Sequence, residues 1–265
     1  MYLAKSCAKR HNLKTSDTLM LGSLYYYRAA ENSEIADGGE GKATYELSIT
    51  GPLEVEKKWL NFLLVGAVGY ASAEDPPRPT GMLDIKLHKY RPIKSRGDSM
   101  LVDELRATIK RDSYNEFIFC MSLVEDPAHA ADIFKSYEDY WIIPASRAQA
   151  MADALAAALD KAVRQGRATG KHVIDPSVSF DDLVYVCRHE SVTYAPRDLH
   201  ITSTSQVTAE EFASKVFDIA FLKPPRFSPE KEYRFSYMLA ANGILVDFIP
   251  DKLLLDARLI RQRIL

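Results

Sequence analysis

The chain has 265 residues, of which 47% are hydrophobic, and its 34 basic and 36 acidic side chains leave a formal net charge of -2. Such a composition is typical of a globular protein that buries a full core. Because the charges nearly cancel, no overall field attracts nucleic acid or an anionic membrane, and we expect neither as a partner.

The cysteines and the apolar stretches indicate in which cellular compartment the protein is expected. Cys7, Cys120 and Cys187 are widely spaced and form no C-x-x-C pair, so we expect reduced thiols and no metal site. The amino-terminal stretch lacks the apolar core of a signal peptide. The most apolar stretch, 59–71, is shorter than the roughly 20 residues that span a bilayer. The sequence therefore predicts a cytoplasmic protein with no membrane contact.

In chain order, the first apolar stretch, 18–28, indicates two short extended pieces bent at Gly22. The stretch 53–68 fits either a buried strand pair or one helix, and the tail 253–265 fits either a strand or a helix. The loop 71–81 contains three prolines, and we expect it to be an exposed interruption. Alternating or apolar runs predict strands over 44–49, 82–93, 115–123, 140–144, 182–194 and 232–239, the last joined through the turn 240–243 to 244–249 in a hairpin.

Helical periodicity predicts three helices, over 101–111, 146–166 and 204–223. The second has Ser146 as its N-cap and Gly166 as its stop. Strands and helices are mixed without strict alternation, and no glycine-rich phosphate-binding motif follows a strand. We therefore expect one α+β domain over 1–265, with a largely antiparallel or mixed central sheet and flanking helices.

The segment PEKEYRFSYML, 229–239, contains the strongest candidate site. Residues two apart on a strand share a face, so Glu230, Glu232 and Arg234 are expected to point one way while the aromatic residues between them point the other. Two carboxylates on one face suit cleavage of an N-glycosidic bond, because one can stabilise an oxocarbenium-like centre while the other orients or deprotonates an acceptor. The alternative is a solvated strand face on which a cation neutralises the pair.

Other candidates lie on the early aromatic run and on the central strand. In YYYR, 25–28, Tyr26 could stack on a nicotinamide or adenine ring and Arg28 could grip a pyrophosphate; packing is the alternative. Cys120 and Ser122 share a face of the central strand, but no nucleophile elbow surrounds Ser122. The turn DGGEG misses the spacing of a Ca²⁺ loop, which favours a plain turn. The mixed basic runs 88–96 and 258–263 could bind phosphate, but solvated strand ends are favoured.

Three segments in order, LGSLYYYRAAENSEIADGGEG, FIFCMSLVED and FLKPPRFSPEKEYRF, resemble a family of bacterial and phage proteins classed as a domain of unknown function. The resemblance covers most of the chain through these short motifs. It implies an intracellular bacterial or phage protein and brings no settled activity.

The chain also resembles mono-ADP-ribosyltransferases of the Arg / Ser-Thr-Ser / Glu-x-Glu kind, through Arg28, the sequence STS at 203–205 and E-K-E at 230–232. The resemblance implies that Arg28 holds NAD, that a serine strand shapes the nicotinamide pocket and that Glu232 stabilises the ribosyl cation. Because STS stands in a polar run before a predicted helix, the strand with Ser122 is the better match for the serine position.

These readings lead to two functional hypotheses. The first is an ADP-ribosyltransferase-like transferase or a glycohydrolase with NAD as substrate and an unknown acceptor. Glu232 and Glu230 are then catalytic, and Arg28, Tyr26, Ser122 and Arg234 contact the dinucleotide. The second is a non-catalytic interaction protein of phage–host conflict that binds a protein partner through its Glu/Arg face.

Overall fold

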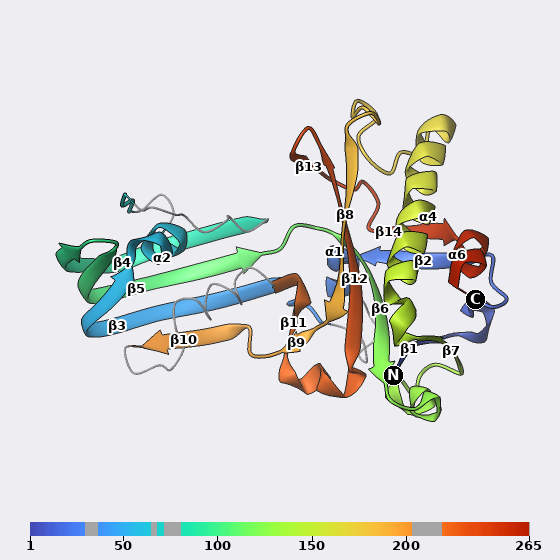
Figure 1. Ribbon diagram of the computed structural model, residues 1–265, viewed down its shortest axis with the longest axis horizontal. Coiled ribbons are helices and arrows are strands. Elements are labelled where there is room, and N and C mark those ends of the chain that lie inside the picture. The colour runs from blue at the N-terminus through green and yellow to red at the C-terminus, as the bar shows by residue number, and fades with distance from the viewer. Residues whose placement is uncertain (30–36, 65–67, 72–80, 203–218, 265) are drawn as a thin grey trace. The chain divides into compact units, whose positions relative to one another are not determined.

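The computed structural model describes residues 1–29, 37–64, 68–71, 81–202 and 219–264 (Figure 1). It confirms an α+β fold with largely antiparallel sheets. Contacts divide the chain into two compact units, unit 1 (Met1–Glu40, Asn115–Thr193 and Arg226–Leu265) and unit 2 (Gly41–Tyr114 and Tyr194–Pro225). A single domain over 1–265 stays a prediction, because a division by contacts does not say whether the units unfold together.

Unit 1 is built on one antiparallel sheet with the strand order β13-β12-β6-β1-β7; β8 also pairs with β12, and β2 pairs with β6 and β14. The strands are β1 (Tyr2–Cys7), β2 (Thr18–Ser23), β6 (Phe117–Val124), β7 (Asp139–Pro144), β8 (Leu183–Ser191), β12 (Glu232–Ala241), β13 (Ile244–Val246) and β14 (Lys252–Asp256). The helices are η1 (Lys9–His11), α1 (Leu24–Arg28), η2 (Pro127–His129), α3 (Ala130–Ile133), η3 (Ala145–Arg147), α4 (Ala148–Thr169), η5 (Pro225–Glu230, whose first residue closes unit 2) and α6 (Ala257–Ile264).

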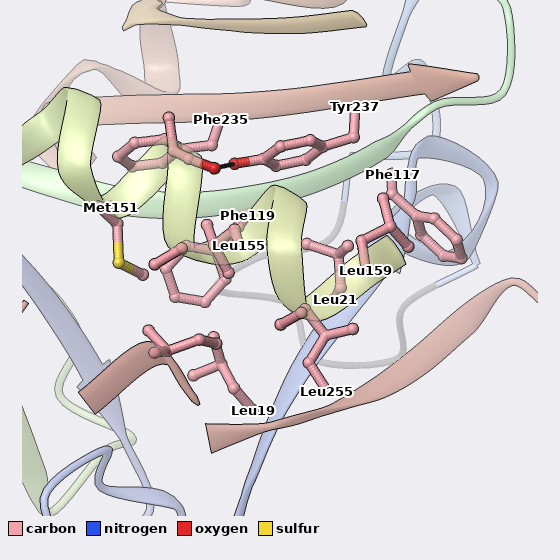
Figure 2. Packing of buried hydrophobic residues seen from close by; sticks show 14 of the residues in the cluster. Leu19, Leu21, Phe117, Phe119, Met151, Leu155, Leu159, Phe235, Tyr237 and Leu255 are labelled. Atoms are coloured by element: carbon pink, nitrogen blue, oxygen red, sulfur yellow. Dashed lines mark hydrogen bonds between the residues drawn. The ribbon is translucent and has the colours of Figure 1, made fainter. Parts of the chain in front are cut away.

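The core of unit 1 lies between α4 and one face of this sheet (Figure 2). Odd-numbered residues of β6 and β12 face the helix, since side chains alternate along a strand. Tyr237 belongs to this face, and its hydroxyl donates to the Ala152 carbonyl oxygen at 3.0 Å. The even-numbered residues of both strands therefore point to the opposite face, which carries the candidate site. Buried side chains around α4 include Leu19, Leu21, Phe117, Phe119, Met151, Leu155, Leu159, Phe235 and Leu255.

The boundaries of α4 differ from the prediction at both ends. The helix is preceded by η3, so Ser146 is not its N-cap, and Arg147 occupies that position without a side-chain cap. At the other end, Gly166 lies inside the helix and Gly170 ends it with φ 74°. A glycine adopts this left-handed conformation at little steric cost.

Unit 2 contains a four-stranded sheet with the order β10-β3-β5-β4, in which β3 and β10 are parallel and the other pairs antiparallel. One face packs with α2 around Tyr45, Leu47, Val102 and Leu105. Its elements are β3 (Lys42–Glu56), α2 (Lys57–Leu63), β4 (Met82–Arg96), β5 (Ser99–Asp112), β10 (Asp198–Thr202), η4 (Ile219–Phe221) and β11 (Leu222–Lys223), which pairs with β9 (Thr193–Tyr194) where the chain passes between the units.

Two sequence predictions of local structure are wrong. The expected helix 101–111 is strand β5, because its residues are paired on both sides, with β3 and with β4. Leu101 and Leu105 are spaced like a helical face, but tertiary pairing overrides that signal. The second extended piece of 18–28 is helix α1, whose N-cap Ser23 accepts a hydrogen bond from the Tyr26 N–H at 3.1 Å.

Other predictions are confirmed, and two ambiguous stretches contain both a strand and a helix. The predicted strands all occur, and the hairpin of β12 and β13 turns at Asn242 and Gly243, both with positive φ. The ambiguous stretch 53–68 contains the end of β3 and then α2, and the tail contains β14 followed by α6. The expected helix 204–223 falls largely, and the loop 71–81 almost wholly, outside the described residues. No helix in the described ranges is long and apolar enough to cross a membrane.

Candidate functional site

The site lies on the face of the unit 1 sheet opposite α4. The register of β12 with β6 places Glu232 opposite Ser122 and Arg234 opposite Cys120. Since alternate residues share a face, these four side chains belong to one row of positions across the two strands. Glu232, Arg234 and Ser122 are buried, and Cys120 is half-buried. The alternative of a solvated strand face is therefore wrong for Glu232 and Arg234.

Glu230 stands outside the strand. It is the last residue of η5, and Lys231, with φ 47°, separates it from the first residue of β12. The prediction that Glu230 and Glu232 share a strand face is therefore wrong, because strand alternation does not extend across a left-handed residue. Both carboxylates are nevertheless buried.

Arg234 is the centre of a buried ion-pair cluster. Its Nε and Nη2 donate to Glu232 Oε1 at 2.7 and 2.6 Å, and its Nη1 donates to Glu40 Oε1 at 2.9 Å. The side chains are 1%, 4% and 3% exposed for Arg234, Glu232 and Glu40. Burial disfavours the charged guanidinium, but the two carboxylates hold the pKa of Arg234 well above its ordinary value.

A tight turn presents Glu40 to this cluster. The Gly39 N–H donates to Asp37 Oδ1 at 3.2 Å, and the Glu40 N–H donates to the Asp37 carbonyl oxygen at 2.8 Å. Arg28 then fixes the turn, because its Nε donates to the Glu40 carbonyl oxygen at 2.6 Å. The guanidinium of Arg28 also lies 4.4 Å from the centre of the Tyr25 ring. In this conformation Arg28 positions the backbone that carries Glu40.

Helix α1 brings two tyrosine rings to the same face. A Cβ atom added at Gly22 would lie 2.8 Å from Tyr27 Cε2 and 2.9 Å from Tyr26 Cδ1, so both rings lie against the glycine. Gly22 pairs with Ile118, which belongs to the row of Ser122. Burial, followed by Cys120 and Glu232, raises the pKa of Tyr27 well above its usual range. Tyr26 packs edge-on against Tyr27, and Lys252 Nζ lies 5.7 Å from its ring centre.

Glu116 adds a third carboxyl to the cluster, directly before β6. Its Oε2 accepts a hydrogen bond from Ser236 Oγ, and its Oε1 is buried without a hydrogen-bond partner. Burial raises the pKa of Glu116 from 4.5 to about 7, although Ser236 and Arg234 oppose the shift. A buried carboxyl that titrates near neutrality is a recurrent feature of functional sites, and also of structural ion-pair networks.

The structure thus brings together most of the residues predicted for the site. YYYR, the central strand and the late strand meet at Tyr27, Cys120 and Glu232. Glu40 and Glu116 were missed. Glu116 could have been found, because it continues the two-residue period of Ser122, Cys120 and Ile118. Glu40 could not, because nothing in the local pattern of DGGEG indicates a contact with a residue near position 234.

The adjacent strand β8 continues this face toward solvent. Arg188 Nη2 and Glu190 Oε1 form an exposed ion pair at 2.5 Å, and Val184 and Val186 lie on the same face with 58% and 37% of their surface exposed. Among the described residues of unit 1, an exposed Glu/Arg pair therefore occurs on β8, one strand away from the predicted pair on β12.

The remaining sequence candidates lie elsewhere or outside the described residues. In the basic run 88–96, Lys89 and Arg91 pair with Glu104 of β5, as expected of a solvated strand. No group of three potential metal ligands occurs within the described part of the chain. The STS sequence at 203–205 is not among the described residues.

Comparisons with known proteins add no relative. No family model matches the chain, and neither the curated proteins nor the solved structures contain a match. The family resemblances described from the motifs therefore stay predictions.

Proposed function

We propose that the protein acts by binding a protein partner, and that the cluster around Arg234 maintains the fold. The contact of Arg234 with both Glu232 and Glu40, out of solvent, carries this proposal. A carboxylate that stabilises a ribosyl cation must face the substrate, where its charge is available as the transition state forms. Glu232 instead faces a guanidinium that already neutralises it.

The binding surface in this proposal is the exposed part of the same sheet face, on β8. It combines the apolar Val184 and Val186 with the charged pair Arg188 and Glu190. Apolar groups beside charged groups are typical of protein interfaces, where the apolar groups supply contact area and the charges fix orientation. The resemblance to a bacterial and phage family makes phage–host conflict the setting of this binding.

The second candidate is the NAD-using transferase or glycohydrolase, and the convergence of α1, β6 and β12 favours it. Here Glu232 stabilises the ribosyl cation as nicotinamide leaves, and Glu230 positions the acceptor. Arg28 and Arg234 hold phosphate, while Tyr26 and Ser122 contact nicotinamide. This mechanism requires NAD to displace Arg234 from Glu232, because the two side chains are in contact without it.

A nicotinamide-release assay separates the two candidates. The parent chain, Glu232→Gln and the surface control Glu190→Gln are incubated with NAD, and thermal unfolding is followed with and without NAD. The binding proposal predicts no release by any chain, no stabilisation by NAD, and reduced stability of Glu232→Gln alone. Release by the parent and by Glu190→Gln, lost in a folded Glu232→Gln, would overturn it in favour of the enzyme.

A further inference from the structure

Strand β8 is an edge of the unit 1 sheet. Among the described strands it pairs only with β12, along all nine of its residues. Its sequence, LVYVCRHES, contains no proline and no lysine. Those are residues with which proteins commonly prevent an edge strand from pairing with another chain. The outer backbone groups of β8 therefore offer a template for a further strand.

The side chains of β8 differ between its two faces. On the α4 side, Tyr185 donates its hydroxyl to Asp160 at 3.0 Å, and His189 bonds to the Tyr233 hydroxyl at 2.8 Å, so this face is integrated into the unit. On the other face, Val184 and Val186 are exposed. A neighbouring strand with apolar residues at matching positions would cover them.

A second copy of β8 supplies such a strand. We propose that two chains associate through antiparallel pairing of β8 with β8, with the two-fold axis at Tyr185. In this register Val184 of each chain lies opposite Val186 of the other. Directly opposite residues share a face of the sheet, so this match occurs twice across the axis.

Neighbouring registers match less well. An axis at Val186 places Val186 opposite its own copy but Val184 opposite Arg188. An axis at Cys187 places Val184 opposite Glu190 and Val186 opposite Arg188. The register at Tyr185 thus places the two exposed valines opposite each other twice across the axis, and apolar cross-strand pairs stabilise a sheet.

This inference rests on the proposed binding function and identifies its partner as a second copy of the chain. It makes β8 the centre of a sheet that continues from one chain into the other.

Analytical ultracentrifugation tests the association. The parent is expected to be a dimer, and Val186→Lys, which removes both apolar matches, is expected to raise the dimer dissociation constant about tenfold or more. Leu254→Lys, at an exposed position of another edge strand, β14, is the matched control and should leave the dimer unchanged. A parent that remains monomeric at every soluble concentration would overturn the inference, as would a dimer equally sensitive to both substitutions.

Disulfide cross-linking tests the register. In a Cys187→Ser background, Val184→Cys on a tagged chain is mixed with Val186→Cys on an untagged chain and oxidised. Opposite positions lie within disulfide range, whereas each cysteine alone is displaced by two residues from its symmetry mate and lies out of range. Cross-linking in the mixture and not in either variant alone is expected; cross-linking of one variant with itself, or none in the mixture, contradicts the register.

The nicotinamide assay on the same preparations distinguishes the two failures. If the parent is a monomer and releases no nicotinamide, the self-pairing is refuted and the proposed binding function stands. If it is a monomer that releases nicotinamide through Glu232, both proposals are refuted. If it is a dimer that releases nicotinamide through Glu232, only the binding function as the primary activity is refuted.

Discussion

Arg234 Nη1 lies 2.9 Å from Glu40 Oε1, although 194 positions separate the two residues in the chain. With Glu232, the arginine joins strand β12 to the turn that follows α1. Two carboxylates share one guanidinium out of solvent, so Arg234 contributes to the neutralisation of both. Removing one member of a buried ion pair leaves a charge without compensation, which costs far more than the pair contributes in total.

Arg234→Met should therefore lower the free energy of unfolding by about 3–5 kcal/mol. Arg258→Met is the control in the same unit, because Arg258 is an exposed partner of Asp256 and such pairs contribute about 0–1 kcal/mol. Urea unfolding measures both. Adding Glu232→Gln and Glu40→Gln to Arg234→Met should recover part of the loss, and equal losses in the two arginine variants would contradict the cluster's structural role.

Stability should fall with pH in a window set by Glu116. The carboxyl has a pKa of about 7 when folded and 4.5 when unfolded, so the folded protein retains the proton longer. Protonated Glu116 contributes its full share to the free energy of unfolding below pH 4.5, and this share is lost as the pH rises to about 7. The loss amounts to about 3 kcal/mol. Glu116→Gln should remove this dependence and be the more stable form at pH 8. Urea unfolding at pH 5 and pH 8 checks this, and identical pH slopes for parent and variant would refute it.

Gly22→Ala should displace α1 from the sheet. The new Cβ would approach both tyrosine rings to less than 3 Å, so we expect a destabilisation of about 1–3 kcal/mol, as for overpacking in a core. Gly38→Ala is the control, because nothing lies within 4 Å of a Cβ there. Thermal unfolding compares them. In a background that already carries Tyr26→Ala and Tyr27→Ala, adding Gly22→Ala should cause no further loss of stability, because the rings that it would crowd are absent. A further loss in the triple variant would argue against crowding as the cause.

Tyr237→Phe should cost about 1 kcal/mol, since it removes the buried hydrogen bond to the Ala152 carbonyl oxygen, with the weaker one to the Cys187 thiol, and leaves the ring in the core (Figure 2). Urea unfolding measures the loss. An unchanged midpoint would mean that the hydroxyl contributes nothing beyond packing.

Local patterns were enough to place most strands and the long helix α4. A continuous apolar run indicated β6, and alternation, which is a property of the strand itself, indicated β12 and its apolar face. The pattern was insufficient for β5, where the spacing of Leu101 and Leu105 resembles a helix, and for α1, whose helical form depends on Ser23 as its cap and on space above Gly22. Pairing partners and packing space are supplied by distant segments.

By itself, the sequence determined which residue types stand on each face of β12, and so that Glu232 and Arg234 lie on the side away from the aromatic core. Only the tertiary structure decided that this side is buried, that Glu40 closes the ion-pair cluster and that Glu116 lies beside Ser236. Side-chain direction along a strand follows from backbone geometry, which is local. Burial and charge pairing depend on which remote segments cover the face, and no periodicity within a segment carries that information.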